Sequence, residues 1–123
     1  MKRILVCDDD ALLIDLLEYR LASRGYEIII ARDGSEALAR LAEATPDAII
    51  LDAMMPVVDG YEVLRRIRET EALAAIPVIM LTARKQERDI LEALELGAND
   101  YIVKPFIPEE LVARLSRLLE AAK

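Results

Sequence analysis

Two kinds of segment alternate along this chain, and the alternation constrains its fold more than any other feature. Short runs rich in apolar and β-branched residues are typical of strands buried on both faces, and segments with helical spacing separate them. The strand-like runs are Arg3–Cys7, Glu27–Ala31, Ala48–Leu51, Pro77–Leu81 and Tyr101–Val103. This order predicts a parallel sheet covered by helices on both faces, which is a doubly wound α/β fold.

The five helical segments carry recognisable start and stop signals. The first covers residues 11–25 and ends at Gly25, which suits a left-handed cap. Its apolar residues are expected on one buried face: Leu13, Leu16, Leu17 and Leu21. The other segments are residues 33–44, 60–73, 86–97 and 108–122. No linker or repeat interrupts the pattern, so we expect residues 1–123 to form one domain.

Composition and charge exclude several classes of function. The net charge is −7, so the phosphate backbone of nucleic acid is repelled and direct binding to it is not expected. The absence of histidine excludes a Ser-His-Asp triad and the commonest zinc ligand. The longest uncharged stretch, Ala72 to Ala83, is too short to span a bilayer. With no signal segment and a single Cys7, the sequence favours the cytoplasm.

The stretch from Ile4 to Asp10 ends an apolar strand on three adjacent carboxylates. At roughly 6 Å and an effective dielectric constant of about 20, each pair of these charges repels by about 3 kcal/mol. Other polar side chains follow other strands: Asp52, Thr82 and Lys104. Because ligands of doubly wound sheets bind beyond the carboxyl ends of the strands, we expect these groups to gather at one edge.

The chemistry of such a cluster points to phosphoryl transfer. An acidic, oxygen-lined pocket suits Mg²⁺, which takes one or two carboxylates and a phosphate oxygen. Together with the ammonium of Lys104 and the hydroxyl of Thr82, the metal would form a receptor for phosphoryl oxygens. A carboxylate in this receptor can act as the nucleophile and form an aspartyl phosphate.

Four blocks of the sequence resemble the response-regulator receiver family of two-component signalling. They are ILVCDDD, IILDAMMPVVDG, VIMLTA and GANDYIVKPF, and the resemblance extends from Met1 to about Glu120. It implies the flavodoxin-like, chemotaxis-regulator-like fold, with five parallel strands in the order 2-1-3-4-5 and five helices. It also implies a phosphoprotein that mediates its own phosphorylation and slow dephosphorylation, and is not a separate turnover enzyme.

The resemblance assigns roles residue by residue. Asp52 matches the phosphoacceptor. Asp9 matches the direct carboxylate ligand of Mg²⁺ (or Mn²⁺), Asp8 the acid that holds the metal largely through water, and Met54 the position whose backbone carbonyl completes the site. The metal set is therefore Asp8, Asp9, Asp52 and Met54.

The remaining positions of the family's site also find counterparts. Thr82 and Lys104 match the hydroxyl and ammonium that contact the phosphoryl group, and Tyr101 matches an aromatic switch residue that changes rotamer with Thr82. The peptide bond between Lys104 and Pro105 matches one that is usually cis in the family. Met54 and Arg84 match the two positions that flank the approach of hydrolytic water, and Met54 cannot orient that water by hydrogen bonding.

Two other functions are compatible with parts of this sequence. In the dehalogenase-type phosphatase superfamily the nucleophile is the first Asp of a pair such as Asp8 and Asp10, which would leave Asp52 without a role. A receiver-like module that binds partners without phosphate is the other alternative. Asp10 itself is equally explained as the N-cap of the first helix.

The resemblance implies partners that the chain cannot replace. Since the chain has no histidine, the phosphoryl donor is expected to be a separate histidine kinase or histidine phosphotransfer protein. A downstream protein target or output domain would receive the signal through the fourth helix, fifth strand and fifth helix. Surplus apolar residues on the first helix, Leu12, Ile14 and Tyr19, indicate either a broad buried face or a docking patch. Asp100 and Arg114 are candidates for pairing across a phosphorylation-dependent dimer, which the sequence leaves open.

Overall fold

The computed structural model describes residues 1–83 and 87–121, in which five strands alternate with five helices. The strands are β1 (Arg3–Cys7), β2 (Glu27–Ala31), β3 (Ala48–Asp52), β4 (Val78–Thr82) and β5 (Asp100–Val103). The helices are α1 (Ala11–Ala22), α2 (Gly34–Glu43), α3 (Gly60–Glu69), α4 (Glu87–Leu96) and α5 (Pro108–Ala121). The predicted alternation is confirmed.

The strands form one parallel sheet in the order β2-β1-β3-β4-β5, as the family resemblance implied. The order in which strands are added to the sheet reverses between β1 and β3, because β2 lies outside β1 and β4 lies outside β3. In register, Cys7 lies beside Leu51, and Asp52 lies beside Leu81. The carboxyl ends of β1 and β3 therefore meet at the reversal, where the rule for doubly wound sheets places a ligand.

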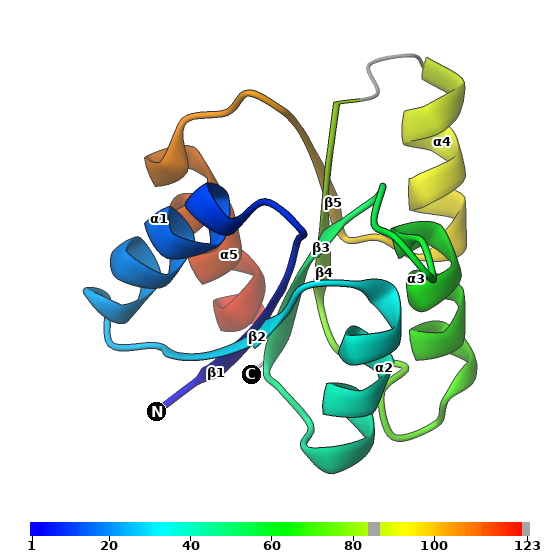
Figure 1. The fold of residues 1–123 in the computed structure, drawn as a ribbon, viewed down its shortest axis with the longest axis horizontal. Helices are drawn as coiled ribbons and strands as arrows, with labels where there is room; N and C mark the ends of the chain where they lie inside the picture. Colours follow the sequence, from blue (N-terminus) through cyan, green and yellow to red (C-terminus); the bar gives the residue numbers. More distant parts are fainter. Residues whose placement is uncertain (84–86, 122–123) are drawn as a thin grey trace.

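Alternate residues of each strand point to opposite faces and build two separate hydrophobic cores. On one face, Leu5, Ile49 and Met80 pack with residues of α2, α3 and α4. On the other, Ile50 and Leu81 pack with residues of α1 and α5. Figure 1 shows this division, with α1 and α5 on one side of the sheet and α2, α3 and α4 on the other. Burial on both faces explains why the strands read as nearly continuous apolar runs.

Several element boundaries differ from the sequence prediction. β3 and β4 extend one residue further, so Asp52 and Thr82 are the last strand residues and do not follow the strands. The reason is that the backbone pairing of β3 with β4 continues past Asp52, where the Ala53 N–H donates to the Leu81 carbonyl at 2.9 Å. The third helix ends at Glu69, four residues earlier than predicted, because Thr70 adopts an extended conformation and its hydroxyl donates to the Arg66 carbonyl.

The predicted buried face of α1 is partly wrong. Ile14, Leu17 and Leu21 are fully buried, whereas Leu16 is 38% exposed. Leu12 and Tyr19 are more exposed still, at 81% and 73%. The buried stripe is therefore rotated toward Ile14, because α1 packs against α5 and the β1 side of the sheet, leaving its other flank without a neighbour.

The helix termini follow local signals in the sequence. Asp10, Asp33 and Asp59 are the N-caps of α1, α2 and α3, and each accepts backbone N–H groups from the first turn. Gly25 follows α1 with φ +87°, a left-handed conformation that glycine adopts without strain. Within the described residues, no helix combines the length and apolar character needed to cross a bilayer.

Candidate functional site

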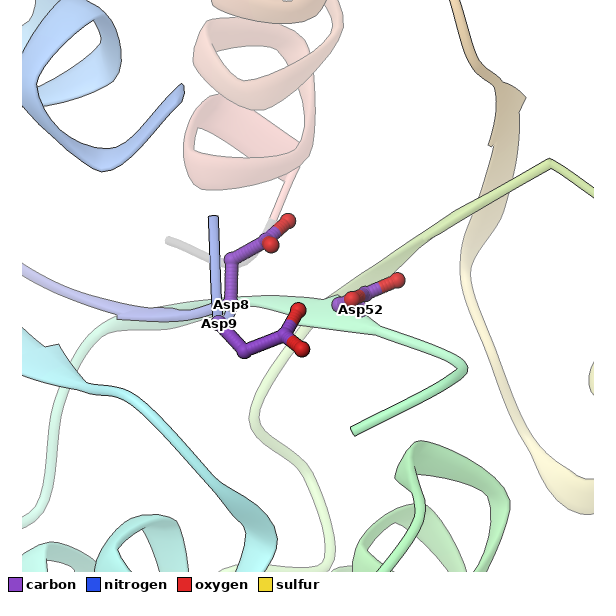
Figure 2. A group of neighbouring side chains, drawn as sticks. All are labelled: Asp8, Asp9 and Asp52. Atoms are coloured by element: carbon purple, nitrogen blue, oxygen red, sulfur yellow. The ribbon is translucent and has the colours of Figure 1, made fainter. Parts of the chain in front are cut away.

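The carboxyl edge of the sheet brings together three of the acidic residues that the sequence analysis singled out. Asp8 follows β1 directly and is fully buried, and Asp52 ends β3 and is almost fully buried. Asp9 is exposed beside them, and one carboxylate oxygen from each residue lies within 4.8 Å of the others. Figure 2 shows the three carboxylates beside one another at the ends of β1 and β3.

Lys104 supplies the positive charge that this cluster needs. Its ammonium donates to Asp8 Oδ2 at 2.9 Å and lies 3.5 Å from Asp52 Oδ1. Burial acts to lower the pKa of Lys104, but its hydrogen bond to Asp8 and the charges of Asp8 and Asp52 raise the pKa overall. The lysine therefore remains an ammonium ion between the two buried acids.

Asp52 is a poorly stabilised carboxylate. Its pKa is raised from 3.8 to about 6, mainly by desolvation and next by the charge of Asp8. Lys104 and the Met54 N–H, which donates to Asp52 Oδ1 at 3.4 Å, act in the opposite direction but do not cancel it. A further positive charge beside this carboxylate would therefore be favourable.

The donor set fits a hard divalent cation. Three carboxylates converge on one point, and Lys104 compensates only part of their charge. Oxygen ligands at an edge open to solvent suit Mg²⁺, which keeps several of its waters and needs only a few protein ligands. No histidine or cysteine lies in the cluster that would favour a softer metal.

The three consecutive acids have separate roles in the structure. Asp8 Oδ1 accepts from the Asp10 N–H at 2.9 Å, while its other oxygen binds Lys104. Asp9 extends toward Asp52 (Figure 2). Asp10 Oδ1 accepts from the Leu12 and Leu13 N–H groups at 3.0 and 3.3 Å and caps α1. Only the first two acids therefore face the candidate metal position.

The other predicted site residues lie on neighbouring strands. Thr82 is fully buried at the end of β4, and its carbonyl accepts from the Lys104 N–H at 2.7 Å. Tyr101 is half-buried on β5 and packs against the core that α2, α3 and α4 cover. The peptide bond between Lys104 and Pro105 is cis. Met54 is half-exposed beside Asp52, and Arg84 lies outside the described residues.

Two features of the loop after β3 were not foreseen from the sequence, and the first is the close approach of Gly60 to the end of β3. The Gly60 N–H donates to the Ala53 carbonyl at 2.8 Å, and a Cβ at Gly60 would lie 2.1 Å from the Asp52 carbonyl oxygen. Only glycine therefore allows α3 to begin against the backbone of Asp52. The local signal that could have indicated this close approach is the Asp59-Gly60 sequence, in which a glycine directly follows the N-cap of α3.

The second unforeseen feature is Val57, which has φ +73° and is 80% exposed. The Val58 N–H donates to the Pro56 carbonyl at 2.9 Å, so Val57 is the central residue of a γ-turn. A β-branched residue is strained in this region of backbone conformation. No sequence signal marks it, since turns of this kind favour glycine or asparagine.

Comparison with known proteins gives one consistent result. The model of the family described as "Response regulator receiver domain" matches residues 4–116. The Bacillus subtilis alkaline phosphatase synthesis transcriptional regulatory protein PhoP is 43% identical over 122 residues, which are 99% of this chain and 50% of that protein. The chain thus spans about half the length of the curated relatives it matches.

Solved structures agree with the sequence comparison. The Francisella response regulator 1452 receiver domain superposes with a TM-score of 0.94 at 32% identity, with both chains covered completely. The receiver domain of the Pseudomonas aeruginosa sensor histidine kinase PA1611, described with a magnesium ion in its active site cleft, gives a TM-score of 0.88 at 35% identity. This match covers 97% of the present chain and 98% of the other.

Proposed function

The chain belongs to the response regulator receiver domain family of two-component signalling, and we propose that it accepts a phosphoryl group on Asp52 from a phosphohistidine partner. The observation that carries this proposal is the position of Lys104, whose ammonium lies between Asp8 and Asp52. A cation that lies between these two carboxylates can neutralise the oxygens of a phosphoryl group added at Asp52, the residue that matches the phosphoacceptor of the family. We take residues 1–123 as one receiver domain.

The proposed metal is Mg²⁺, or Mn²⁺ in its place. Asp8, Asp9, Asp52 and the Met54 carbonyl would hold it, and the convergence of the three carboxylates supports this assignment. The bound ion would supply positive charge for the oxygens of the transferring phosphoryl group. The receiver domain of PA1611, with magnesium in its active site cleft, is a related precedent.

The transfer itself would be carried by groups of this chain. A carboxylate oxygen of Asp52 attacks phosphorus, the bond from phosphorus to the histidine nitrogen of the donor breaks, and the electron pair leaves with that nitrogen. Lys104 and Thr82 would bind phosphoryl oxygens, the first by charge and the second by its hydroxyl. Lys104 already stands 3.5 Å from Asp52, so little movement is needed to reach the product.

The labelled residue decides this proposal. In the presence of Mg²⁺, a phosphohistidine donor or a small acyl phosphate should add one phosphoryl group to the protein. Borohydride reduction followed by mass spectrometry should locate this group at Asp52. Asp52→Asn should abolish labelling, while Asp47→Asn, on the opposite edge of the sheet, should leave it unchanged. Label at Asp8 would instead support the phosphatase-type alternative, and a complete lack of label would support a phosphate-independent binding module.

The exposed flank of α1 supports a docking surface for the donor. Leu12, Leu16 and Tyr19 follow one another at helical spacing, and all three are exposed. This exposure favours the docking interpretation over a broad buried face for these residues, whereas Ile14 belongs to the core. We propose that a helix of the histidine kinase or phosphotransfer protein packs here.

The output would leave through α4, β5 and α5. We propose that Thr82 moves toward the phosphoryl group and that Tyr101 then changes rotamer, altering the surface that a target protein or output domain reads. If Tyr101 keeps one rotamer with and without a bound phosphate mimic, this coupling is wrong.

Dimerisation on phosphorylation remains a separate proposal. The candidate dimer pair, Asp100 and Arg114, is joined within one chain at 2.9 Å, so both residues would need to exchange partners in a dimer. Sedimentation before and after phosphorylation tests this proposal, and a monomer in both states would exclude it.

A further inference from the structure

Arg68, near the end of α3, makes an unusual set of contacts outside the acidic site. A guanidinium group has five N–H donors, and in Arg68 each is directed at a backbone or amide oxygen. Nε and one Nη donate to the Gly97 carbonyl at 3.0 and 2.8 Å, and the same Nη donates to Asn99 Oδ1 at 2.9 Å. The other Nη donates to the carbonyls of Ala74 and Ile76 at 3.1 and 2.7 Å.

These bonds join the end of α3 to two other stretches of the chain, the loop before β4 and the connection between α4 and β5. Gly97 closes the C-terminal end of α4, Asn99 leads into β5, and Ala74 and Ile76 precede β4. Asn99 extends the network, because its Oδ1 also accepts from the Val78 N–H at 2.8 Å. Figure 1 shows α3 and α4 beside each other on the same side of the sheet. Arg68 therefore connects the end of α4 to the body of the domain.

Gly97 is fitted to this contact in two ways. Its φ of +110° is a left-handed conformation, and its N–H donates to the Leu94 carbonyl as α4 ends. A Cβ at this position would also lie 2.8 Å from Arg68 Nε. The backbone at Gly97 thus lies directly against the Arg68 side chain, with no room for a Cβ between them.

The packing of α4 is uneven along its length. Ala93 is its only fully buried residue, whereas α3 has several in a helix of the same length. Near the C-terminal end, Leu96 and Ala98 also pack against the core. In the first turn, Glu87 and Arg88 are exposed, and Asp89 and Ile90 are only half-buried. The buried side chains of this region and the Arg68 bonds are therefore concentrated at the C-terminal end of α4.

We propose that Arg68 anchors the C-terminal end of α4, so that α4 moves as a lever about Gly97 when the receiver switches and its first turn is displaced furthest. A segment held by few buried contacts opens locally at lower free energy than one held by many. The charge-assisted bonds to Gly97 raise the free energy of opening at the other end. This inference rests on the proposed switching of the α4–β5–α5 surface, and it assigns a positioning role to a residue remote from Asp52.

The anchor is tested first in the unphosphorylated protein by amide hydrogen exchange in the full chain. The reporters are the Gly97, Ala98 and Asn99 amides, which donate to the carbonyls of Leu94, Ala93 and Val78. Arg68→Met should speed their exchange by about tenfold or more, the equivalent of one lost hydrogen bond to a charged group. Unchanged exchange would overturn the anchor.

Two further variants separate the anchor from general loss of stability. Arg65→Met changes the same residue type on the same helix, but Arg65 pairs on the surface with Glu62 and Glu69 of α3 itself, so its variant should leave the reporters unchanged. Arg68→Lys keeps the charge with fewer donors, so the exchange rate of the reporters should lie between those of the parent and Arg68→Met. This variant also tests the anchor if Arg68→Met does not fold. In each variant, exchange in the buried strand β3 reports global unfolding.

The lever is tested by adding beryllofluoride and Mg²⁺, with binding followed by fluorine NMR. Exchange should change in the first turn of α4 and stay constant at Gly97, Ala98 and Asn99. An equal change at both ends, or none at either end with the mimic bound, would overturn the lever and leave the receiver function standing. If the mimic does not bind, the proposed function fails together with the lever, while the Arg68 variants still decide the anchor.

Discussion

Replacing Asp52 by Asn should stabilise the metal-free protein at neutral pH, although it removes the proposed phosphoacceptor. The pKa of Asp52 is raised to about 6, mainly by desolvation and next by the charge of Asp8. The ionised side chain is therefore unfavourable in the folded state. An asparagine keeps an oxygen for Lys104 and for the Met54 N–H, but it carries no charge.

The magnitude follows from the pKa difference between the folded and unfolded states. The ordinary value of 3.8 and the folded value of about 6 differ by about 2 units, and each unit corresponds to about 1.4 kcal/mol. Between these values the unfolded chain has released its proton while the folded protein still holds it, so stability falls as pH rises. The gain from Asp52→Asn is then near zero at pH 3.8 and grows to about 3 kcal/mol at pH 7.

The assay is urea unfolding in EDTA at several pH values from 4 to 7.5, repeated with Mg²⁺. For a domain of 123 residues, a change of about 3 kcal/mol corresponds to roughly 10 °C in Tm. Mg²⁺ should reduce the gain, because a cation offsets the repulsion in the parent protein. Asp59→Asn is the control, since it changes the net charge equally and asparagine still caps α3. An equal gain at pH 4 and pH 7.5, or an equal gain in the control, would refute the argument.

Three further changes test other parts of the structure. Val57→Gly should raise the free energy of unfolding by about 0.5–1 kcal/mol, because the strain of a left-handed residue exceeds the entropic cost of glycine; a loss of stability in urea would contradict this. Asp10→Ala should lower stability by about 1 kcal/mol through loss of the α1 cap while Asp52 is still phosphorylated, and loss of phosphorylation would show that Asp10 belongs to the site. Met54→Asn should speed the decay of the phosphorylated protein by one to two powers of ten, since an amide can orient water where a thioether cannot; an unchanged decay rate would show that Met54 does not set the lifetime.

The alternation of strands and helices was predictable because each kind of element has its own spacing of apolar residues along the sequence. Apolar runs of four or five residues and helical stripes are properties of neighbouring residues, and they identified all ten elements. The boundaries were less predictable where distant contacts set them. β3 continues through Asp52 because Leu81 of β4 pairs with it, and α3 stops at Glu69 where Thr70 turns the chain.

Burial on α1 shows why periodicity alone does not place a helix. The sequence offers leucines and isoleucine around most of the helix, and several stripes satisfy helical spacing equally well. Packing against α5 selected Ile14, Leu17 and Leu21 and left Leu12, Leu16 and Tyr19 exposed. The buried stripe of a helix is the one that faces another element of the fold. For α1 that element is α5, which lies far along the chain.

The kinds of group at the carboxyl ends of the strands were predictable from local sequence. A strand followed by acids, a hydroxyl or a lysine is recognisable from neighbouring residues, and parallel strands carry such groups to one edge. The distances and the electrostatics of the site depend on the folded arrangement. Lys104 reaches Asp8 across 96 residues, the pKa of Asp52 is raised mainly by burial, and Arg68 finds its four acceptor oxygens before β4 and between α4 and β5. Backbone conformation depends mainly on neighbours in sequence, whereas desolvation and hydrogen-bond partners depend on neighbours in space, which exist only after the chain has folded.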